Sequence, residues 1–114
     1  MADLGRRWIA AWNSRDLDRI LALYDDAAEM ASAGIVRLGL SAEGRLNGKE
    51  RLRAYWSKAL AALPDLHFEL LDVSVGPDSL IVRYRNERRQ TIGEYLRVNA
   101  AGLIVQGSAN NRLD

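Results

Sequence analysis

Two short amphipathic helices joined by a tight corner open this chain and constrain its fold more than any other feature. Around the corner Asn13-Ser-Arg-Asp16, apolar residues recur at helical spacing: Leu4, Trp8, Ala11 and Trp12 before it, and Leu17, Ile20, Leu21 and Tyr24 after it. Asp16 is placed to cap the second helix, because its carboxylate can accept hydrogen bonds from free backbone N–H groups. We expect Asp25-Asp26 to close that helix.

The next segment predicts a strand, an irregular stretch and a third helix. Residues 27–32 favour a short strand, whereas residues 33–46 contain three glycines, which indicates turns. Asn47, with Glu50 three residues later, resembles a capping box. A stripe at helical spacing follows: Leu52, Tyr55, Trp56, Ala59, Leu60 and Leu63. Pro64 ends this helix because it disfavours helical backbone in the residue before it.

The remainder of the chain favours strands separated by short turns. Four strand-like segments follow one another: residues 66–75, 80–88, 92–99 and 103–111. Consecutive strands with short connections form a meander. Helices first and an antiparallel sheet second predict an α+β fold, with the helices laid across one sheet face.

Three segments together resemble a known family: the paired helices within residues 8–28, the stretch Gly48-Lys-Glu-Arg-Leu-Arg-Ala-Tyr-Trp56, and the Pro64-Asp65 that follows. They resemble the SnoaL-like branch of the nuclear transport factor 2-like superfamily, which includes ketosteroid isomerases, limonene-epoxide hydrolases, polyketide cyclases and non-enzymatic binding modules. The resemblance implies one domain over residues 1–114, in which a curved, cone-shaped antiparallel sheet wraps around N-terminal helices, as in the cystatin-like α+β roll. It also implies a homodimer formed through the outer sheet face.

The composition argues against several functions. A chain of 114 residues is long enough for one core only, and without cysteine it can form neither disulfides nor thiolate-based metal sites. A net charge of +1 gives little attraction to phosphate backbones, so we expect no nucleic-acid partner. No stretch approaches the roughly 18 apolar residues of a membrane helix, and the N-terminus lacks the apolar region of a signal peptide. We expect a cytoplasmic protein without membrane association.

Strand alternation predicts which side chains face the helices. The inward parity of the second strand is Leu80, Val82, Tyr84, Asn86 and Arg88, and that of the last strand is Leu103, Val105, Gly107, Ala109 and Asn111. In the strand between them, Glu94 shares its parity with the apolar Leu96 and Val98. A carboxylate is therefore expected inside the cone, beside small residues that leave space for a pocket.

The hairpin after Arg88 is the weakest point of this assignment. It lacks a clear turn sequence, and a slip of one residue would point Glu94 outward, toward Arg83 and Arg85. The outer face is expected to carry Ile81, Tyr95 and Ile104, which favour pairing with a second copy.

Glu94 is the leading candidate for chemistry. The resemblance aligns it with a protonated Asp in the oxyanion hole of ketosteroid isomerases, a carboxyl kept neutral by an apolar site. The competing interpretation is a Glu at the pocket rim, paired with an Arg such as Arg88. If Glu94 is buried, its pKa should exceed the ordinary value of about 4.3, and Glu94→Gln should keep the fold while weakening ligand binding.

The rest of the isomerase machinery is missing. The oxyanion-hole Tyr of that family falls on Trp8, which can donate a hydrogen bond but cannot exchange a proton. The general base falls at Ala31 or Ser32, neither of which can abstract a proton from carbon. Steroid isomerisation by the known route is therefore disfavoured. Trp56 and Tyr84 align with pocket-lining positions, although core packing is the more common explanation of aromatics at this spacing.

Metal chemistry is not expected. His67 is the sole histidine, and Asp25, Asp26 and Glu29 match no cation-loop spacing. The arginines between residues 83 and 89 alternate with other side chains, which is typical of a solvated or subunit-facing surface. The sequence predicts neither a metal nor another cofactor.

The sequence thus predicts a pocket protein that binds a small apolar or carbonyl-bearing molecule. Glu94 is the tentative catalytic residue for isomerase- or hydrolase-like acid–base chemistry, with a lining of Trp8, Trp56, Tyr84, Asn86 and Asn111. The alternative is a non-catalytic association module that binds a partner through its sheet. An open cavity that contains a buried Glu94 would favour the first hypothesis, and a filled cone the second.

Overall fold

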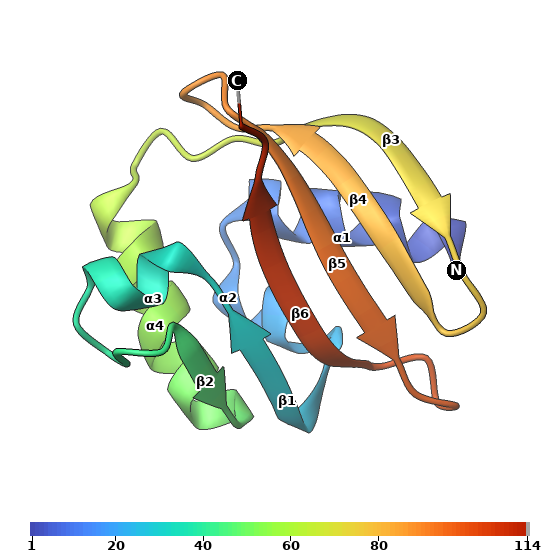
Figure 1. Ribbon diagram of the computed structural model, residues 1–114, viewed down its shortest axis with the longest axis horizontal. Helices are drawn as coiled ribbons and strands as arrows, with labels where there is room; N and C mark the ends of the chain where they lie inside the picture. The colour runs from blue at the N-terminus through green and yellow to red at the C-terminus, as the bar shows by residue number, and fades with distance from the viewer. Residues whose placement is uncertain (114) are drawn as a thin grey trace.

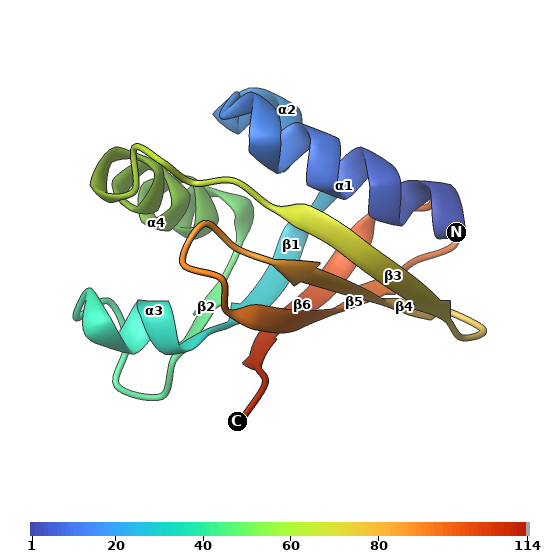
Figure 2. The same ribbon diagram turned by 90° about the horizontal axis from the view of Figure 1, so that it is seen from above.

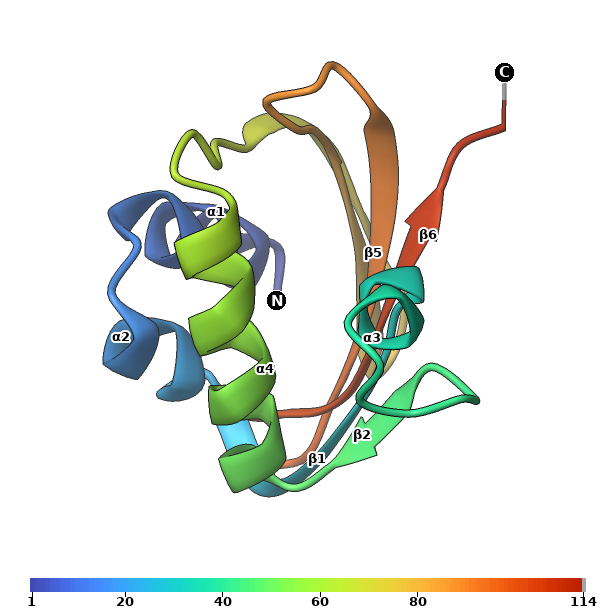
Figure 3. The ribbon, with the colours of Figure 1, turned by 90° about the vertical axis from the view of Figure 1, so that its left-hand side faces the viewer.

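A curved six-stranded sheet forms the frame of the molecule in the computed structural model, which describes residues 1–113 (Figure 1). The strand order across the sheet is β2-β1-β6-β5-β4-β3, and only the β1–β6 pair is parallel. Helices α1, α2 and α4 cover one face, while the opposite face carries no helix layer (Figures 2 and 3). This arrangement confirms the predicted α+β cone.

The predicted N-terminal corner is confirmed. Helix α1 (Ala2–Ser14) ends at Arg15, whose backbone lies in the left-handed region at φ 61°, and α2 (Leu17–Leu21) follows. Asp16 caps α2, because its Oδ1 accepts a hydrogen bond from the Arg19 N–H at 3.2 Å.

The predicted end of α2 is wrong. The helix stops at Leu21, and Tyr24 and the two aspartates belong to β1 (Tyr24–Ala31). The chain becomes extended there because Leu23 accepts a backbone hydrogen bond from Ile104, and Tyr24 pairs with the same residue. Asp25 supports the strand, since its carboxylate accepts from the Ala27 N–H and from the Asn99 side chain. Long-range pairing therefore overrides the local helical spacing.

The stretch predicted as irregular contains two short elements. Ser32 caps α3 (Ala33–Arg37) by accepting from the Gly34 N–H, and β2 (Arg45–Asn47) pairs antiparallel with β1. Helix α4 (Lys49–Ala62) begins after Gly48, whose φ of 94° suits glycine, and no side chain caps it. The expected capping role of Asn47 is therefore wrong, because Asn47 is the last residue of β2.

The predicted four-strand meander is confirmed. Its strands are β3 (Glu69–Val75), β4 (Ser79–Arg85), β5 (Thr91–Val98) and β6 (Ile104–Asn111). Val82 lies opposite Glu94 and Leu80 opposite Leu96, so Glu94 faces the helices as expected.

A side-chain-supported turn sets the β4–β5 register. Asn86 Oδ1 accepts hydrogen bonds from the backbone N–H groups of Arg88 at 3.0 Å and Gln90 at 2.9 Å, while Arg89 takes a positive φ of 63°. Strand β4 ends before this turn. The inward position predicted for Arg88 is therefore wrong, and its side chain is exposed.

The inward parity predicted for the last strand fails in its first half. A register irregularity brings Ile104 opposite Val98 and Gly107 opposite Leu96. Ile104 is consequently buried in the core, whereas Val105 is only half-buried. The placement of Leu103 and Val105 inward and of Ile104 outward is thus wrong, but the parity from Gly107 to Asn111 holds.

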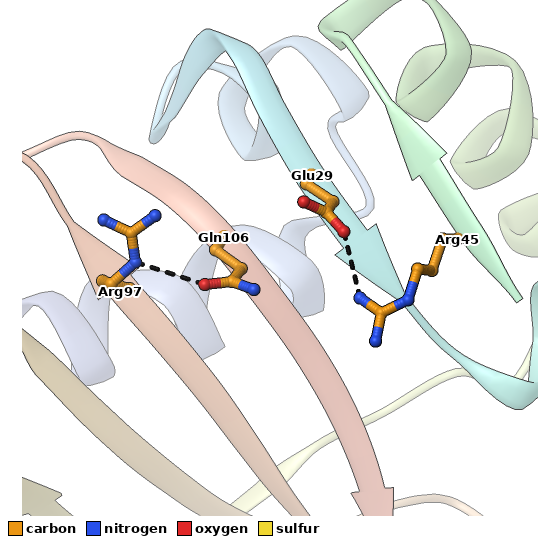
Figure 4. A network of polar contacts seen from close by, with 4 residues as sticks. All are labelled: Glu29, Arg45, Arg97 and Gln106. Atoms are coloured by element: carbon orange, nitrogen blue, oxygen red, sulfur yellow. Dashed lines mark hydrogen bonds and ion pairs between the residues drawn. The ribbon is translucent and has the colours of Figure 1, made fainter.

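On the outer sheet face, polar side chains of neighbouring strands form hydrogen bonds with one another. Arg45 donates to Glu29 at 3.0 Å and Arg97 to Gln106 at 3.2 Å, each across neighbouring strands (Figure 4). The exposed Arg45–Glu29 ion pair contributes little to stability, on the order of 0–1 kcal/mol. Within residues 1–113, no helix is long and apolar enough to cross a membrane.

Asn13 is a testable link between the first helix and the sheet. Its side chain donates to the Phe68 carbonyl at 2.9 Å and accepts from the Phe68 N–H at 2.8 Å, which fixes the chain just before β3. Asn13→Ala leaves both backbone groups without these partners, so we expect a loss of about 1–3 kcal/mol in the free energy of unfolding. Urea denaturation measures the free energy of unfolding. Asn47→Ala, at an exposed strand position, is the control and should change stability little. Equal losses in both variants would contradict the proposed role of the Asn13 side chain in holding Phe68.

Candidate functional site

A cavity of about 330 Å³ lies between the helices and the inner sheet face. This volume falls at the lower end of the range for small-molecule pockets, roughly 300–1,000 Å³. Its walls are formed by helix α3 and six further elements: α1, α4, β1, β4, β5 and β6. The innermost side chains are Trp8, Trp12, Tyr24, Trp56, Phe68, Tyr84 and Glu94, and the outer ones include Ser32, Arg37, Tyr55, Asn86, Arg88, Gln90 and Asn111.

Stacked aromatic rings form the apolar wall. The Phe68 ring stacks on Tyr84 with centroids 4.2 Å apart and on Trp8 at 5.8 Å. Trp56 closes the other side, at 4.9 Å from Tyr24 and edge-on to Trp12 at 5.2 Å. Such packing holds each ring in a defined orientation, so the cavity has firm walls.

Glu94 is the buried carboxyl of this cavity. Its side chain is 2% exposed, Oε1 accepts a hydrogen bond from the Tyr84 hydroxyl at 3.1 Å, and Oε2 has no partner among the described residues. Burial raises the pKa of Glu94 to about 7, although the Tyr84 hydrogen bond opposes this rise. In the neutral carboxyl, the proton falls on Oε2, because Oε1 already accepts from Tyr84.

Tyr24 offers a second hydroxyl beside Glu94. The Trp8 indole Nε1 donates to the Tyr24 hydroxyl at 2.9 Å, and since an indole N–H can only donate, Tyr24 must be the acceptor. No acceptor for the Tyr24 hydroxyl hydrogen is found within residues 1–113, so that hydrogen is available to a ligand. Burial, followed by the nearby Glu94 charge, raises the pKa of Tyr24 well above its ordinary value, so the hydroxyl stays protonated.

Trp12 adds a third donor. Its Nε1 is buried and, in the described part of the chain, has no hydrogen-bond partner. The residues that line the cavity therefore include N–H and O–H donors that no described residue uses. Groups of this kind recognise an acceptor such as a carbonyl oxygen.

The structure brings most of the predicted lining together. Trp8, Trp56, Tyr84 and Glu94 meet in the interior, whereas Asn111 lies exposed at the rim. Asn86 also reaches the lining, but its amide oxygen is used by the turn. The alternative pairing of Glu94 with Arg88 is not observed, because Tyr84 is the partner of Glu94.

Tyr24 and Trp12 were not predicted as site residues. Both belong to the apolar helical stripes of the N-terminal segment, a pattern that indicates core packing and gives no sign of a cavity. Of the two positions aligned with the missing base, Ser32 lines the cavity, and its hydroxyl lies 3.3 Å from that of Tyr55. Among residues 1–113, no three His, Cys, Asp or Glu side chains are grouped to hold a metal.

The chain belongs to the SnoaL-like domain family, whose model matches residues 5–106. A SnoaL-like protein of unknown function from Burkholderia thailandensis is 39% identical, with a TM-score of 0.91 over 97% of this chain and 92% of that one. An NTF2-like protein of unknown function from Burkholderia pseudomallei is 15% identical, with a TM-score of 0.75 over 94% and 86% of the two chains. TerC, co-crystallised with polyporic acid, is 14% identical, with a TM-score of 0.78 over 94% and 87%. No match is found among curated protein sequences.

The raised pKa of Glu94 predicts a specific pH dependence of stability. The unfolded carboxyl loses its proton near pH 4.5 and the folded one near 7, so the folded state binds more protons between these values. The contribution of Glu94 is therefore present below pH 4.5 and lost as the pH rises through 7. Relative to wild type, Glu94→Gln should gain up to about 3 kcal/mol of unfolding free energy between pH 5 and 8.

Urea denaturation across this range measures the difference, and the carbon-13 shift of the Glu94 carboxyl gives its pKa directly. Glu50→Gln, at an exposed position on α4, is the control, and its stability difference from wild type should be the same at every pH between 5 and 8. A stability difference that does not change between pH 5 and 8 would contradict the buried, proton-binding state of Glu94.

Proposed function

We propose that this protein binds a small, largely apolar molecule that carries a carbonyl group. The observation that supports this most directly is Glu94 Oε2, a buried polar atom that has no partner and belongs to a side chain lining the aromatic cavity. A buried group left unsatisfied costs about 1–3 kcal/mol. A ligand that accepts a hydrogen bond from the neutral Glu94 carboxyl offsets that cost. Without a ligand, the buried carboxyl only lowers stability.

The donors around the cavity define the ligand's polar end. The neutral Glu94 carboxyl, the Tyr24 hydroxyl and the Trp12 indole each have a hydrogen to donate. A carbonyl oxygen accepts such hydrogens and donates none, so it matches them. Stacked rings suit the apolar body of the ligand. The co-crystallisation of TerC with polyporic acid supports a small-molecule ligand for a protein of this fold.

Acid–base chemistry is the kind of reaction that this site favours. Hydrogen bonds from Glu94 and Tyr24 to one carbonyl oxygen stabilise negative charge that develops on it, as isomerase- or hydrolase-like steps require. The general base of ketosteroid isomerases aligns with Ala31 or Ser32, and neither side chain abstracts a proton from carbon. Steroid isomerisation by the known route therefore remains disfavoured. The open cavity and buried Glu94 favour this proposal over a non-catalytic association module.

The proposed ligand binding should depend on the protonation of Glu94. With 2-acetylnaphthalene as a probe, affinity measured by tryptophan fluorescence should fall about tenfold from pH 6 to pH 8, because one unit above its pKa only about a tenth of Glu94 is neutral. Glu94→Gln should bind more weakly at pH 6, since an amide is a poorer donor, and its affinity should not vary with pH. Glu50→Gln should match wild type. A wild-type affinity that is the same at pH 6 and 8 would refute the role of Glu94.

We also propose a homodimer through the outer sheet face. Of the three apolar residues expected on the outer face, Ile104 lies in the core and cannot contribute to an interface. Ile81, which is 39% exposed, and the half-buried Tyr95 remain available on that face. Light scattering at tens of micromolar should give a mass near twice the 12.7 kDa of the chain. Ile81→Glu should shift the mass toward the monomer, because it places a charge in the interface. A monomeric wild type over this concentration range would rule the proposal out.

A further inference from the structure

The mouth of the cavity is positively charged, in contrast to its apolar interior. Arg37 reaches it from α3 and Arg88 from the β4–β5 turn, and both line the cavity. The same two arginines line an adjoining hollow of about 230 Å³, which Tyr55 and Leu63 of the α4 segment also border. Arg37 and Arg88 line both spaces, so the two arginines lie where the hollow and the cavity adjoin.

Arg37 belongs to a corner that is rich in hydrogen-bond donors. The Tyr55 hydroxyl, Arg37 Nη2 and Ser32 Oγ all lie within 3.5 Å of the point that a Cβ on Gly34 would occupy. Glycine at this position therefore lets the three polar groups converge. Burial raises the pKa of the Tyr55 hydroxyl, while the Ser32 hydrogen bond and the Arg37 charge oppose the rise. The hydroxyl stays protonated and can donate alongside the guanidinium.

Arg88 stands across the mouth on a fixed turn. Asn86 Oδ1 accepts from its backbone N–H, so the base of the side chain is held in place. The one carboxylate at the mouth is Glu87, whose Oε1 already accepts from the His67 N–H at 3.3 Å. Neither Arg37 nor Arg88 takes part in an ion pair within the described residues. The mouth thus carries two guanidinium groups without ion-pair partners and one carboxylate, which leaves an excess of one positive charge.

We propose that the ligand is a keto acid: its carbonyl reaches Glu94, and a carboxylate at its other end binds Arg37 and Arg88 at the mouth. This inference rests on the function proposed above and specifies its ligand class. A guanidinium group presents N–H donors in a plane that matches the two oxygens of a carboxylate. The aromatic wall between the two ends accommodates a flat apolar body.

Two probes of the same shape separate the two ends of the ligand. 2-Acetylnaphthalene offers the carbonyl alone, and 6-acetyl-2-naphthoic acid adds a carboxylate at the far end of the ring system. At pH 6 and low salt, the acid should bind about tenfold more tightly than the ketone, in line with a charge-assisted hydrogen bond. This preference should shrink as salt is added, because the mouth is open to solvent.

Variants at the mouth test which charges act. Arg37→Gln and Arg88→Gln should each weaken binding of the acid about three- to tenfold and leave binding of the ketone unchanged. Arg89→Gln is the matched control: it removes the same charge from the same turn, but Arg89 does not line the cavity. It should therefore bind both probes as wild type does. Thermal melts of each variant test whether these exposed substitutions leave the fold intact.

The outcomes distinguish the two proposals. If the ketone binds with the expected pH dependence and the acid binds no more tightly, the keto-acid inference is overturned while the proposed function stands. If Arg89→Gln weakens the acid as much as Arg88→Gln does, the preference reflects overall charge, and the inference also falls. If neither probe binds, both proposals fail.

Discussion

The register of the β4–β5 hairpin is the constraint on which the site depends. Side chains alternate along a strand, so a shift of one residue would exchange the two faces of β5. The turn at residues 86–90 prevents this shift, because one amide oxygen, Asn86 Oδ1, holds two backbone N–H groups. As a result Val82 lies opposite Glu94, and Tyr84 on the same inner face reaches its carboxyl. The Asn86 side chain thus supports the register that places Glu94 inside the cone.

The cone stays open because its walls cannot collapse onto one another. The rings of Trp8, Phe68 and Tyr84 stack along one side, and the rigid packing of large aromatics leaves space that smaller flexible side chains would fill. On β6 the inward positions opposite Leu96 and Glu94 are Gly107 and Ala109, which project little into the interior. Large residues on the helices and small ones on the last strand together produce a cavity beside the carboxyl.

A carboxyl in such a place lowers stability. Burial without a second hydrogen-bond partner raises its pKa to about 7 and favours the neutral form. Functional sites commonly retain groups of this kind at the expense of stability. The family relationship alone does not explain it, because proteins of one fold serve unrelated functions. The case for ligand binding therefore depends on the geometry around Glu94 in this chain, and the fold provides only the setting.

The sequence by itself determined the α+β class, the N-terminal helix pair and the four-strand meander, and it favoured an inward Glu94. These features follow from local periodicity: helical spacing around the N-terminal corner, and alternation in Leu80–Tyr84 and Glu94–Val98. Only the tertiary structure decided that α2 ends at Leu21, that Ile104 is buried, and that Tyr24, Trp12 and Tyr55 join the site. Each of these depends on contacts between distant segments, such as the pairing of Tyr24 with Ile104. Strand pairing and the register irregularity in β6 change which face of the sheet a residue occupies. Neither feature can be predicted from a local pattern in the sequence.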